Sequence, residues 1–421
     1  MKYYLLLISL VLTANAAQLQ PNDWPQWRGP ARDGTVKSSL PWPASLQTDS
    51  LRKSWSVDLG PSYSGAIVAG GKVFTTETVN KKSERVTAFD RAIGKKIWET
   101  EWQGAMKVPF FAARNGSWIR ATPATDGKSL FVAGIRDVLV SLDVETGSVN
   151  WRYDFVSKLK TPLPSFGMVC SPLLDDRHVY IQAGAGFCKI DKATGKLIWR
   201  TATDKGGMFG SAFSSPVRAT IAGRDLFVVQ SRTALQLVDA QSGKVEFSQP
   251  IKAFRGMNIL TPIVIDDQIF TSAYGGRSHL FSVKSVNGNL AMNELWNVKH
   301  QGYMSTPLVI DGVVYHHLRN QRLLALTLAN GAELWNQSNR FGKYWSMVTD
   351  GKRILALDQD GTLRLLNANR QEFEQIDSRR IAKDSWAHLA ISNGQIFVRE
   401  LDKLTVYDWG NTGRPLAQKS R

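Results

Sequence analysis

The sequence lacks long apolar runs and is poor in acidic residues. A membrane helix needs roughly 18 uninterrupted apolar residues, and the first apolar run, Leu5 to Leu12, is too short. No membrane-spanning segment is therefore predicted. Only 36 Asp and Glu stand against 52 Lys and Arg, which gives a formal net charge of +16. The excess is spread along the chain, so it predicts attraction to anionic partners and does not indicate a fold.

Cysteine is also scarce, with two residues in 421. In an oxidising compartment a disulfide between Cys170 and Cys188 is one possibility. Alternation of residues places them on the first and third strands of one sheet, two spacings of about 4.8 Å apart. That separation exceeds the Cα limit of roughly 7 Å for a disulfide, so we expect two free thiols.

The first residues are typical of an export signal. Lys2 precedes the apolar run, and the small-residue segment Ala14-Asn15-Ala16 follows it. We expect residues 1–16 to be a signal peptide, with a buried N-terminal strand as the alternative. No cysteine lies near this point, so no lipid anchor is predicted there. The protein is then expected in the periplasm or outside the cell, where nucleic acid is not a partner.

An internal repeat dominates the rest of the chain. The segments Val86 to Trp98, Leu139 to Trp151 and Phe187 to Trp199 each show alternating residues ending in Asp, a short turn closed by Gly, and a second alternating segment with Trp. Alternation indicates half-buried strands, and the Gly-closed turn indicates a β-hairpin. Weaker copies follow at 235–247, 279–296, 323–335 and 363–373.

Another hairpin precedes each of these, with a two-residue turn of small or amide residues. The turns lie at 70–71, 126–127, 175–176, 223–224, 266–267, 311–312, 350–351 and 393–394. Its first strand often opens at a small residue before proline, as in Thr122-Pro123 and Ser171-Pro172, and proline suits the start of a strand. Four antiparallel strands recurring at roughly 40 to 50 residues predict the blades of a β-propeller.

Eight such units can be counted, and the eighth ends after a third strand at 404–408. Residues 51–59 have the pattern of an outer strand without a hairpin, so they are expected to complete that blade and close the ring. We therefore predict an all-β, eight-bladed propeller of four-stranded antiparallel blades over residues 51–410, which we expect to be a monomeric ring. Residues 17–50 form an N-terminal extended segment of unpredicted course, and 411–421 a C-terminal tail. The tryptophans at 55, 98, 151, 199, 296 and 335 are interpreted as packing between blades.

The pattern Asp-x-x-Thr/Ser-Gly-Lys/Ser-x-x-Trp at 143–151 and 191–199 resembles the repeats of the pyrroloquinoline-quinone-like (PQQ-like) propellers. The resemblance covers about residues 51–409, and the segment from Asp23 to Gly34 is similar to the opening of many exported bacterial members. This family includes PQQ-dependent alcohol dehydrogenases and the propeller component of the machinery that assembles outer-membrane β-barrels. The resemblance therefore implies the fold and leaves the chemistry open.

The dehydrogenases of that family hold the quinone under a disulfide of adjacent cysteines, beside calcium bound by carboxylates and an amide. This chain has no adjacent cysteine pair and no cluster of acidic residues at strand starts that would bind calcium. We therefore expect no cofactor, no metal and no enzymatic activity, with PQQ and calcium in a dehydrogenase-like oxidoreductase as one alternative. An outer-membrane assembly role is the other, although that component is usually lipid-anchored.

Loops on one face of the ring are where a ligand is expected. The connections from each outer strand to the next inner strand interleave basic and aromatic residues, which would attract an anion and hold a planar group. Alternatively, these are solvated loop residues and aromatics that plug the channel. The sequence thus predicts a non-enzymatic binding or scaffold protein of the bacterial periplasm or cell envelope, which binds an anionic ligand or protein partner at this mouth. The candidate residues are Arg114, Trp118, Arg120, Phe209, Arg255, Lys299, Tyr303, Arg340, Lys343, Trp345 and Trp386.

Overall fold

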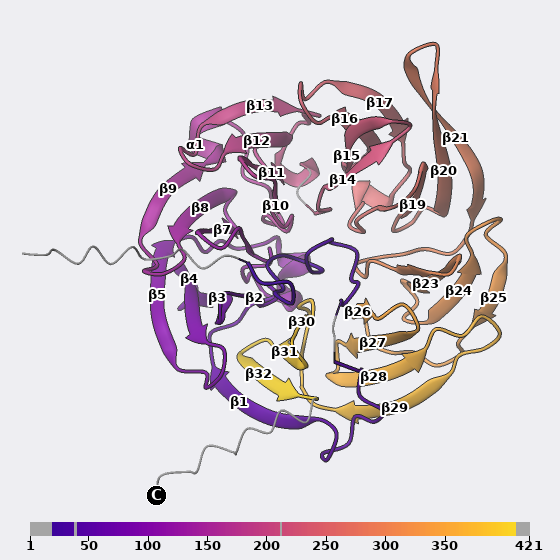
Figure 1. Ribbon diagram of the computed structural model, residues 1–421. Helices are drawn as coiled ribbons and strands as arrows, with labels where there is room; N and C mark the ends of the chain where they lie inside the picture. The colour runs from indigo at the N-terminus through magenta and orange to yellow at the C-terminus, as the bar shows by residue number, and fades with distance from the viewer. Residues whose placement is uncertain (1–18, 38–39, 211–212, 410–421) are drawn as a thin grey trace, which may run out of the picture.

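Eight four-stranded antiparallel sheets form a ring around a central channel (Figure 1). This computed structural model describes residues 19–37, 40–210 and 213–409. The expected eight-bladed, all-β propeller is confirmed. The signal peptide predicted at 1–16 and the tail predicted at 411–421 lie outside the described residues. In the part of the chain that the structure describes, no helix has the length and apolar character needed to cross a membrane.

Seven blades are continuous in sequence, and their strands follow one another from the channel outward (Figure 1). Alternating apolar residues form these strands, and hairpin turns of small residues join them. Their bounds are β2 (Ile67–Ala69), β3 (Lys72–Val79), β4 (Ser83–Asp90) and β5 (Lys96–Gln103); β6 (Ala124–Thr125), β7 (Ser129–Gly134), β8 (Val138–Asp143) and β9 (Val149–Asp154); β10 (Leu173–Leu174), β11 (His178–Gln182), β12 (Phe187–Asp191) and β13 (Leu197–Thr201); β14 (Val217–Ile221), β15 (Arg224–Gln230), β16 (Ala234–Asp239) and β17 (Val245–Pro250); β18 (Ile263–Ile265), β19 (Gln268–Ser272), β20 (Ser278–Val286) and β21 (Asn289–Val298); β22 (Leu308–Ile310), β23 (Val313–His317), β24 (Leu323–Thr327) and β25 (Glu333–Asn336); β26 (Trp345–Thr349), β27 (Arg353–Asp358), β28 (Thr362–Asn367) and β29 (Gln375–Arg380).

The eighth blade joins the two ends of the chain. It consists of β30 (Ala390–Ser392), β31 (Gln395–Arg399) and β32 (Lys403–Asp408), and its outer strand is β1 (Arg52–Asp58). β1 runs antiparallel to β32 from the pair Arg52 and Asp408 to the pair Asp58 and Lys403. The predicted closure is therefore confirmed, and it leaves no unpaired edge on β32.

The recurring tryptophans pack across the seams between blades, as predicted. Trp98 on β5 donates its indole N–H to the carbonyl of Val144 in the next blade at 3.0 Å, and its ring lies against Gly147 of the same turn. A Cβ on Gly147 would come within 2.5 Å of that ring, and its φ of +72° also favours glycine. The same indole bond joins Trp55 to Arg91, Trp151 to Lys192, Trp296 to Leu328 and Trp335 to Asn369.

Both cysteines are buried free thiols, as expected. Cys188 lies on the third strand of its blade, β12. Cys170 was expected on the first strand of that blade, but it lies in the connection that leads to β10. The short strand β10 begins only after Pro172, because proline cannot donate to the sheet.

Among the described residues, three short 3-10 helices and one α-helix lie in the connections between blades. The 3-10 helices are Phe110–Asn115, Gly207–Phe209 and Phe254–Gly256. The α-helix, α1 (Phe155–Leu159), is capped by the Asp154 side chain, which accepts from the backbone N–H of Ser157. The helices therefore lie at one end of the blades, on the face where each outer strand leads to the next inner strand.

The N-terminal segment crosses the other end of the channel (Figure 1). Trp24 forms a β-bridge with Val68 of the first blade, and Thr35 forms one with Thr349 of the seventh. The chain then passes Asp377 on β29, which accepts from the backbone N–H of Leu46, before it enters β1. The segment therefore crosses the end of the ring opposite the connections between blades.

Candidate functional site

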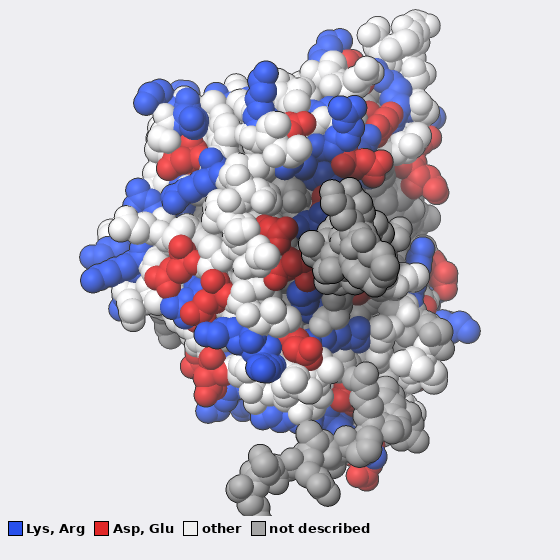
Figure 2. Space-filling model, turned by 60° about the vertical axis from the view of Figure 1, so that its left-hand side comes forward, with Lys and Arg blue, Asp and Glu red and all other residues white. Residues whose placement is uncertain are grey.

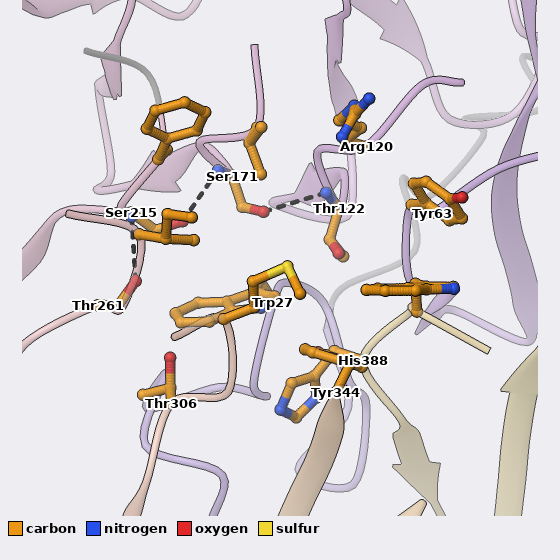
Figure 3. Close-up of a pocket in the computed structure, with 15 residues that line it drawn as sticks. Trp27, Tyr63, Arg120, Thr122, Ser171, Ser215, Thr261, Thr306, Tyr344 and His388 are labelled. Atoms are coloured by element: carbon orange, nitrogen blue, oxygen red, sulfur yellow. Dashed lines mark hydrogen bonds between the residues drawn. The ribbon is translucent and has the colours of Figure 1, made fainter. Parts of the chain in front are cut away.

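A cup lies at the centre of the ring, with a cavity volume of about 140 Å³. Its wall is formed by residues just before the innermost strands of most blades, and Trp27 of the N-terminal segment lies within it (Figure 3). The lining residues are Trp27, Tyr63, Arg120, Thr122, Val169, Ser171, Phe213, Ser215, Ile259, Thr261, Met304, Thr306, Tyr344, Trp386 and His388.

One side of the cup is an arc of hydroxyl groups from successive blades (Figure 3). The backbone N–H of Thr122 donates to Ser171 Oγ, the N–H of Ser171 to Ser215 Oγ, and the N–H of Ser215 to Thr261 Oγ1, each at 3.0 Å. The backbone N–H of Gly65 donates to Thr122 Oγ1 in the same way at 3.1 Å. Each hydroxyl oxygen thus accepts from a neighbouring blade, which fixes its position around the axis.

The other side of the cup is aromatic (Figure 3). Tyr63 and Trp386 have ring centroids 5.6 Å apart, and Tyr344 stacks on Trp386 at 6.4 Å. His388 meets the Trp27 ring edge-on at 5.9 Å. Burial and the nearby Arg28 lower the pKa of His388 to about 3, so its imidazole is neutral at pH 7.

Arg120 is the cation of the cup. Its guanidinium lies 5.6 Å from the centroid of the Tyr63 ring, and it donates to the carbonyl of Gly116 at 3.0 Å. Burial lowers the pKa of Arg120, and its Nε has no partner among the described residues. Arg120 is thus held at the wall of the cup by an aromatic ring and one carbonyl.

Two buried arginines flank Trp27. Arg28 donates to the carbonyls of Thr306 and Pro307 in the sixth blade, at 3.0 and 3.1 Å. Arg32 donates to the carbonyl of Pro172 in the third blade at 2.7 Å. Their guanidiniums lie 5.6 and 5.5 Å from the centroid of Trp27, and burial lowers the pKa of each to about 10. The N-terminal segment is therefore anchored to two blades, and it carries two positive charges beside the cup.

Of the candidate residues identified from sequence, the structure brings Arg120 and Trp386 into the cup. Trp118 hydrogen-bonds Tyr63, and Tyr303 interacts electrostatically with Arg120, so both lie beside it. Trp345 is instead buried, where it stacks on His317 at 5.4 Å. The side chains of Arg114 and Phe209 lie outside the part that the structure describes. Four cations are exposed in the connections around the mouth and do not line the cup: Arg255, Lys299, Arg340 and Lys343.

Sequence reasoning missed most of the lining. The small residue before proline was identified as a strand start, and its recurrence in successive blades was a signal that these hydroxyls would encircle the channel. No comparable signal pointed to Trp27, because the course of an extended segment depends on contacts distant in sequence. His388 lies two positions after the candidate Trp386, in the same connection, but was not selected itself.

The cup does not fit a calcium-bound quinone. Calcium takes six to eight oxygen ligands, with carboxylates prominent among them, and none of the lining residues is Asp or Glu. Among residues 19–37, 40–210 and 213–409, no group of three or more His, Cys, Asp or Glu could hold a metal. Cys170 and Cys188 are 18 positions apart and buried, so they cannot supply an adjacent pair. No redox step is therefore derived for this site.

The chain matches a protein family described as outer membrane protein assembly factor BamB over residues 82–337, which is more than half of its length. The protein of that name from Yersinia pestis is 23% identical over 370 residues, covering 83% of this chain and 85% of that protein. The one from Moranella endobia is 22% identical over 349 residues, covering 78% of this chain and 83% of that protein.

Solved structures show the same fold. The crystal structure of BamB from Moraxella catarrhalis superposes with a TM-score of 0.62 at 15% identity, covering 87% of this chain and 99% of that one. A europium-containing methanol dehydrogenase superposes with a TM-score of 0.51 at 10% identity, covering 92% of this chain and 98% of that one. At sequence identities of 15% and 10%, the superpositions show a common propeller fold and nothing about function.

Proposed function

The chain belongs to the family described as outer membrane protein assembly factor BamB, and on that premise we propose that it is a non-enzymatic scaffold that binds a protein partner during the assembly of outer-membrane proteins. The family match over residues 82–337 is the observation that carries this proposal. The lining of the cup is consistent with it, since the cup offers no carboxylate that could act as a general base or bind a metal.

The face around the cup has the composition of a protein-binding surface. Phe110 is 90% exposed, Phe111 55% and Phe254 48%, and all three lie in connections between blades on this face. Phe110 and Phe111 are in contact, with ring centroids 5.5 Å apart, and adjacent exposed apolar side chains on a folded protein indicate an interaction site. The Phe111 ring contacts Phe166, which contacts Phe213 in the cup, with centroids 6.0 Å apart in both pairs. An apolar partner surface can therefore follow these rings from the rim to the cup.

The charge of this rim favours a partner with acidic groups. The exposed cations Arg255, Lys299, Arg340 and Lys343 lie in the same set of connections as the exposed phenylalanines. Asp360 and Asp402 are also exposed in turns on this face, and on the flank shown in Figure 2 Lys and Arg are interspersed with Asp and Glu. Acidic groups placed around an apolar contact would be attracted to this rim and would increase the rate of association.

Site-specific photo-crosslinking in intact cells tests the proposal. A photoreactive amino acid at Phe110 or Phe254 is expected to capture an outer-membrane assembly component, identified by mass spectrometry. The matched control is Ile93, which is 62% exposed in a hairpin turn on the opposite face. The proposal fails if all three positions give only the uncrosslinked monomer, or if position 93 captures the same proteins as strongly as position 110.

A further inference from the structure

Three guanidinium groups lie around the cup. Arg28 and Arg32 are buried beside Trp27, and Arg120 lies in the wall. None of them forms an ion pair with a carboxylate of the described residues. The Nε of each is buried and has no hydrogen-bond partner there. Buried charges in proteins are normally paired, so the cup is a place where a negative charge would be stabilised.

The hydroxyl arc supplies donors for that negative charge. Thr122, Ser171 and Thr261 each use the hydroxyl oxygen to accept a backbone N–H, and no described hydrogen bond uses their O–H as the donor. A hydroxyl has one hydrogen to donate in addition to its two acceptor positions. These hydrogens are therefore available to an oxyanion that enters the cup on the side of Arg120 (Figure 3).

The aromatic side chains next to Arg120 determine the rest of the ligand. Tyr63, Trp386 and Trp27 present ring surfaces, which favour a flat apolar group. The volume of about 140 Å³ limits the size of that group. An apolar cavity of about 150 Å³ in another protein holds one benzene molecule, so the cup has room for one ring and its substituent.

We propose that the cup binds a small ligand that carries a carboxylate close to a single aromatic ring, with the carboxylate at Arg120 and the hydroxyl arc and the ring against the aromatic side chains. The ligand is a free aromatic acid or the carboxylate end of a polypeptide whose last residue is aromatic, since both present a carboxylate close to one ring. This site does not depend on the scaffold role, because the rim contacts a partner through side chains outside the cup.

Calorimetric titration of the full-length mature chain at pH 7 and low salt tests the proposal, with benzoate and benzamide as the probes. Benzoate is expected to bind one per chain. Benzamide has the same ring without the charge and is expected to bind at least about tenfold more weakly, since a charge-assisted hydrogen bond is lost. Equal binding of the two probes, or no binding of benzoate, would overturn the proposal.

Three substitutions locate the site. Arg120→Gln is expected to weaken benzoate binding at least about tenfold, whereas Arg52→Gln removes an exposed cation of the outer strand β1 and is expected to leave it unchanged. Arg120→Lys keeps the charge and is expected to retain part of the affinity. If Arg120→Gln binds benzoate as the unchanged chain does, the assignment of the site to the cup is wrong.

Two further measurements complete the test. N-acetyltyrosine imitates the end of a polypeptide, so binding tighter than that of benzoate would assign the ligand to a chain end, and weaker binding would assign it to a free acid. Should Arg120→Gln fail to fold, the melting temperature of the unchanged chain serves instead. Benzoate in excess is expected to raise it more than benzamide does, and equal shifts would overturn the proposal. Crosslinking at Phe110 in Arg120→Lys tests the scaffold role separately.

Discussion

The outer seams of the propeller and its central cup are built in opposite ways. At the seams the same device recurs, in which a tryptophan indole donates to the next blade and lies against a turn glycine, as with Trp98 and Gly147. At the cup the repetition is only partial, since five successive blades contribute a hydroxyl residue before proline, whereas the other three contribute Tyr63, Tyr344 and His388. The comparison teaches that the repeat maintains the ring, whereas binding specificity can arise only where the repeats diverge, at the axis.

A second kind of contact between blades, near the cup face, occurs at two of the seams: that of the first and second blades and that of the second and third. Glu84 on β4 accepts from the backbone N–H of Ile135 in the second blade at 2.8 Å. Asp137, at the corresponding position of the second blade, accepts from the N–H of Gly184 in the third, also at 2.8 Å. Burial raises the pKa of both carboxyls to about 7. The seam between the first and second blades and the seam between the second and third therefore each contain a contact that is sensitive to pH.

The largest expected effect comes from breaking the seam that closes the ring. Replacing residues 52–58 by a Gly/Ser segment of equal length removes Trp55 and leaves β32 without its partner. We expect the free energy of unfolding to fall by about 5 kcal/mol or more, because loss of one buried aromatic alone costs about 3–5 kcal/mol. Urea denaturation followed by circular dichroism measures the loss. The same replacement in β29 (Gln375–Arg380), an outer strand that does not close the ring, is the control. An equal loss there would show that ring closure makes no extra contribution to the free energy of unfolding.

The next effect concerns the carboxyls of Glu84 and Asp137. Their folded pKa values lie above the unfolded ones, so the stability they contribute is present at pH 4 and is lost as the pH rises through about 7, by about 3 kcal/mol for each group. The buried histidines 316, 317 and 388 have pKa values lowered to about 3 and act in the opposite direction between pH 3 and 6.5.

The two carboxyls are therefore measured by difference. The double substitution Glu84→Gln and Asp137→Asn leaves the histidines in place, so the free energy of unfolding of the unchanged chain minus that of the variant is expected to decrease from pH 5 to pH 8. Urea denaturation at each pH gives this difference. A difference that is constant across this range would show that the two carboxyls titrate normally and that these seams are not sensitive to pH.

A smaller effect separates the Trp–Gly contact from backbone strain. Gly147 and Gly223 have similar φ values, +72° and +75°, but a Cβ at Gly223 meets nothing within 4 Å. Gly223→Ala is expected to cost about 1 kcal/mol from the left-handed backbone alone. Gly147→Ala is expected to cost about 2–4 kcal/mol, because the methyl group also overlaps the Trp98 ring. Thermal or urea unfolding measures both costs. Equal costs would show that the packing of the Trp98 ring on Gly147 adds nothing to the cost of the left-handed backbone.

The smallest effect is expected at the axis. Ser171→Ala removes the acceptor of the Thr122 backbone N–H, and we expect it to cost about 1–2 kcal/mol. Thr306→Val is the control, because no described hydrogen bond uses the Thr306 hydroxyl, and we expect a cost of less than about 0.5 kcal/mol. Urea midpoints compare the two variants. Should Thr306→Val cost as much as Ser171→Ala, the hydrogen bond from the Thr122 N–H to Ser171 Oγ would not stabilise the fold.

Most of the architecture could be predicted because it depends on local sequence patterns. The number of blades, their hairpins and the closure by residues 51–59 follow from alternation and turn residues, which depend on neighbours in sequence. The packing role of Trp98 and its equivalents followed from their repetition. The binding site was predicted only in part. Loop composition pointed to Arg120 and Trp386, but the same reasoning selected Trp345, which is buried against His317.

The sequence by itself determined the repeat, the hairpins and the ring, since each blade specifies its own strands and turns. Only the tertiary structure decided what lies at the axis. Trp27 reaches the cup because Arg28 and Arg32 bind carbonyls of blades that lie nearly 280 and 140 positions further along the chain. The hydroxyls of Ser171 and Thr261 converge because ring closure brings the strand starts to one circle. Contacts between segments so distant in sequence have no local pattern, so the floor and the charge of the cup could be recognised only after the ring had closed.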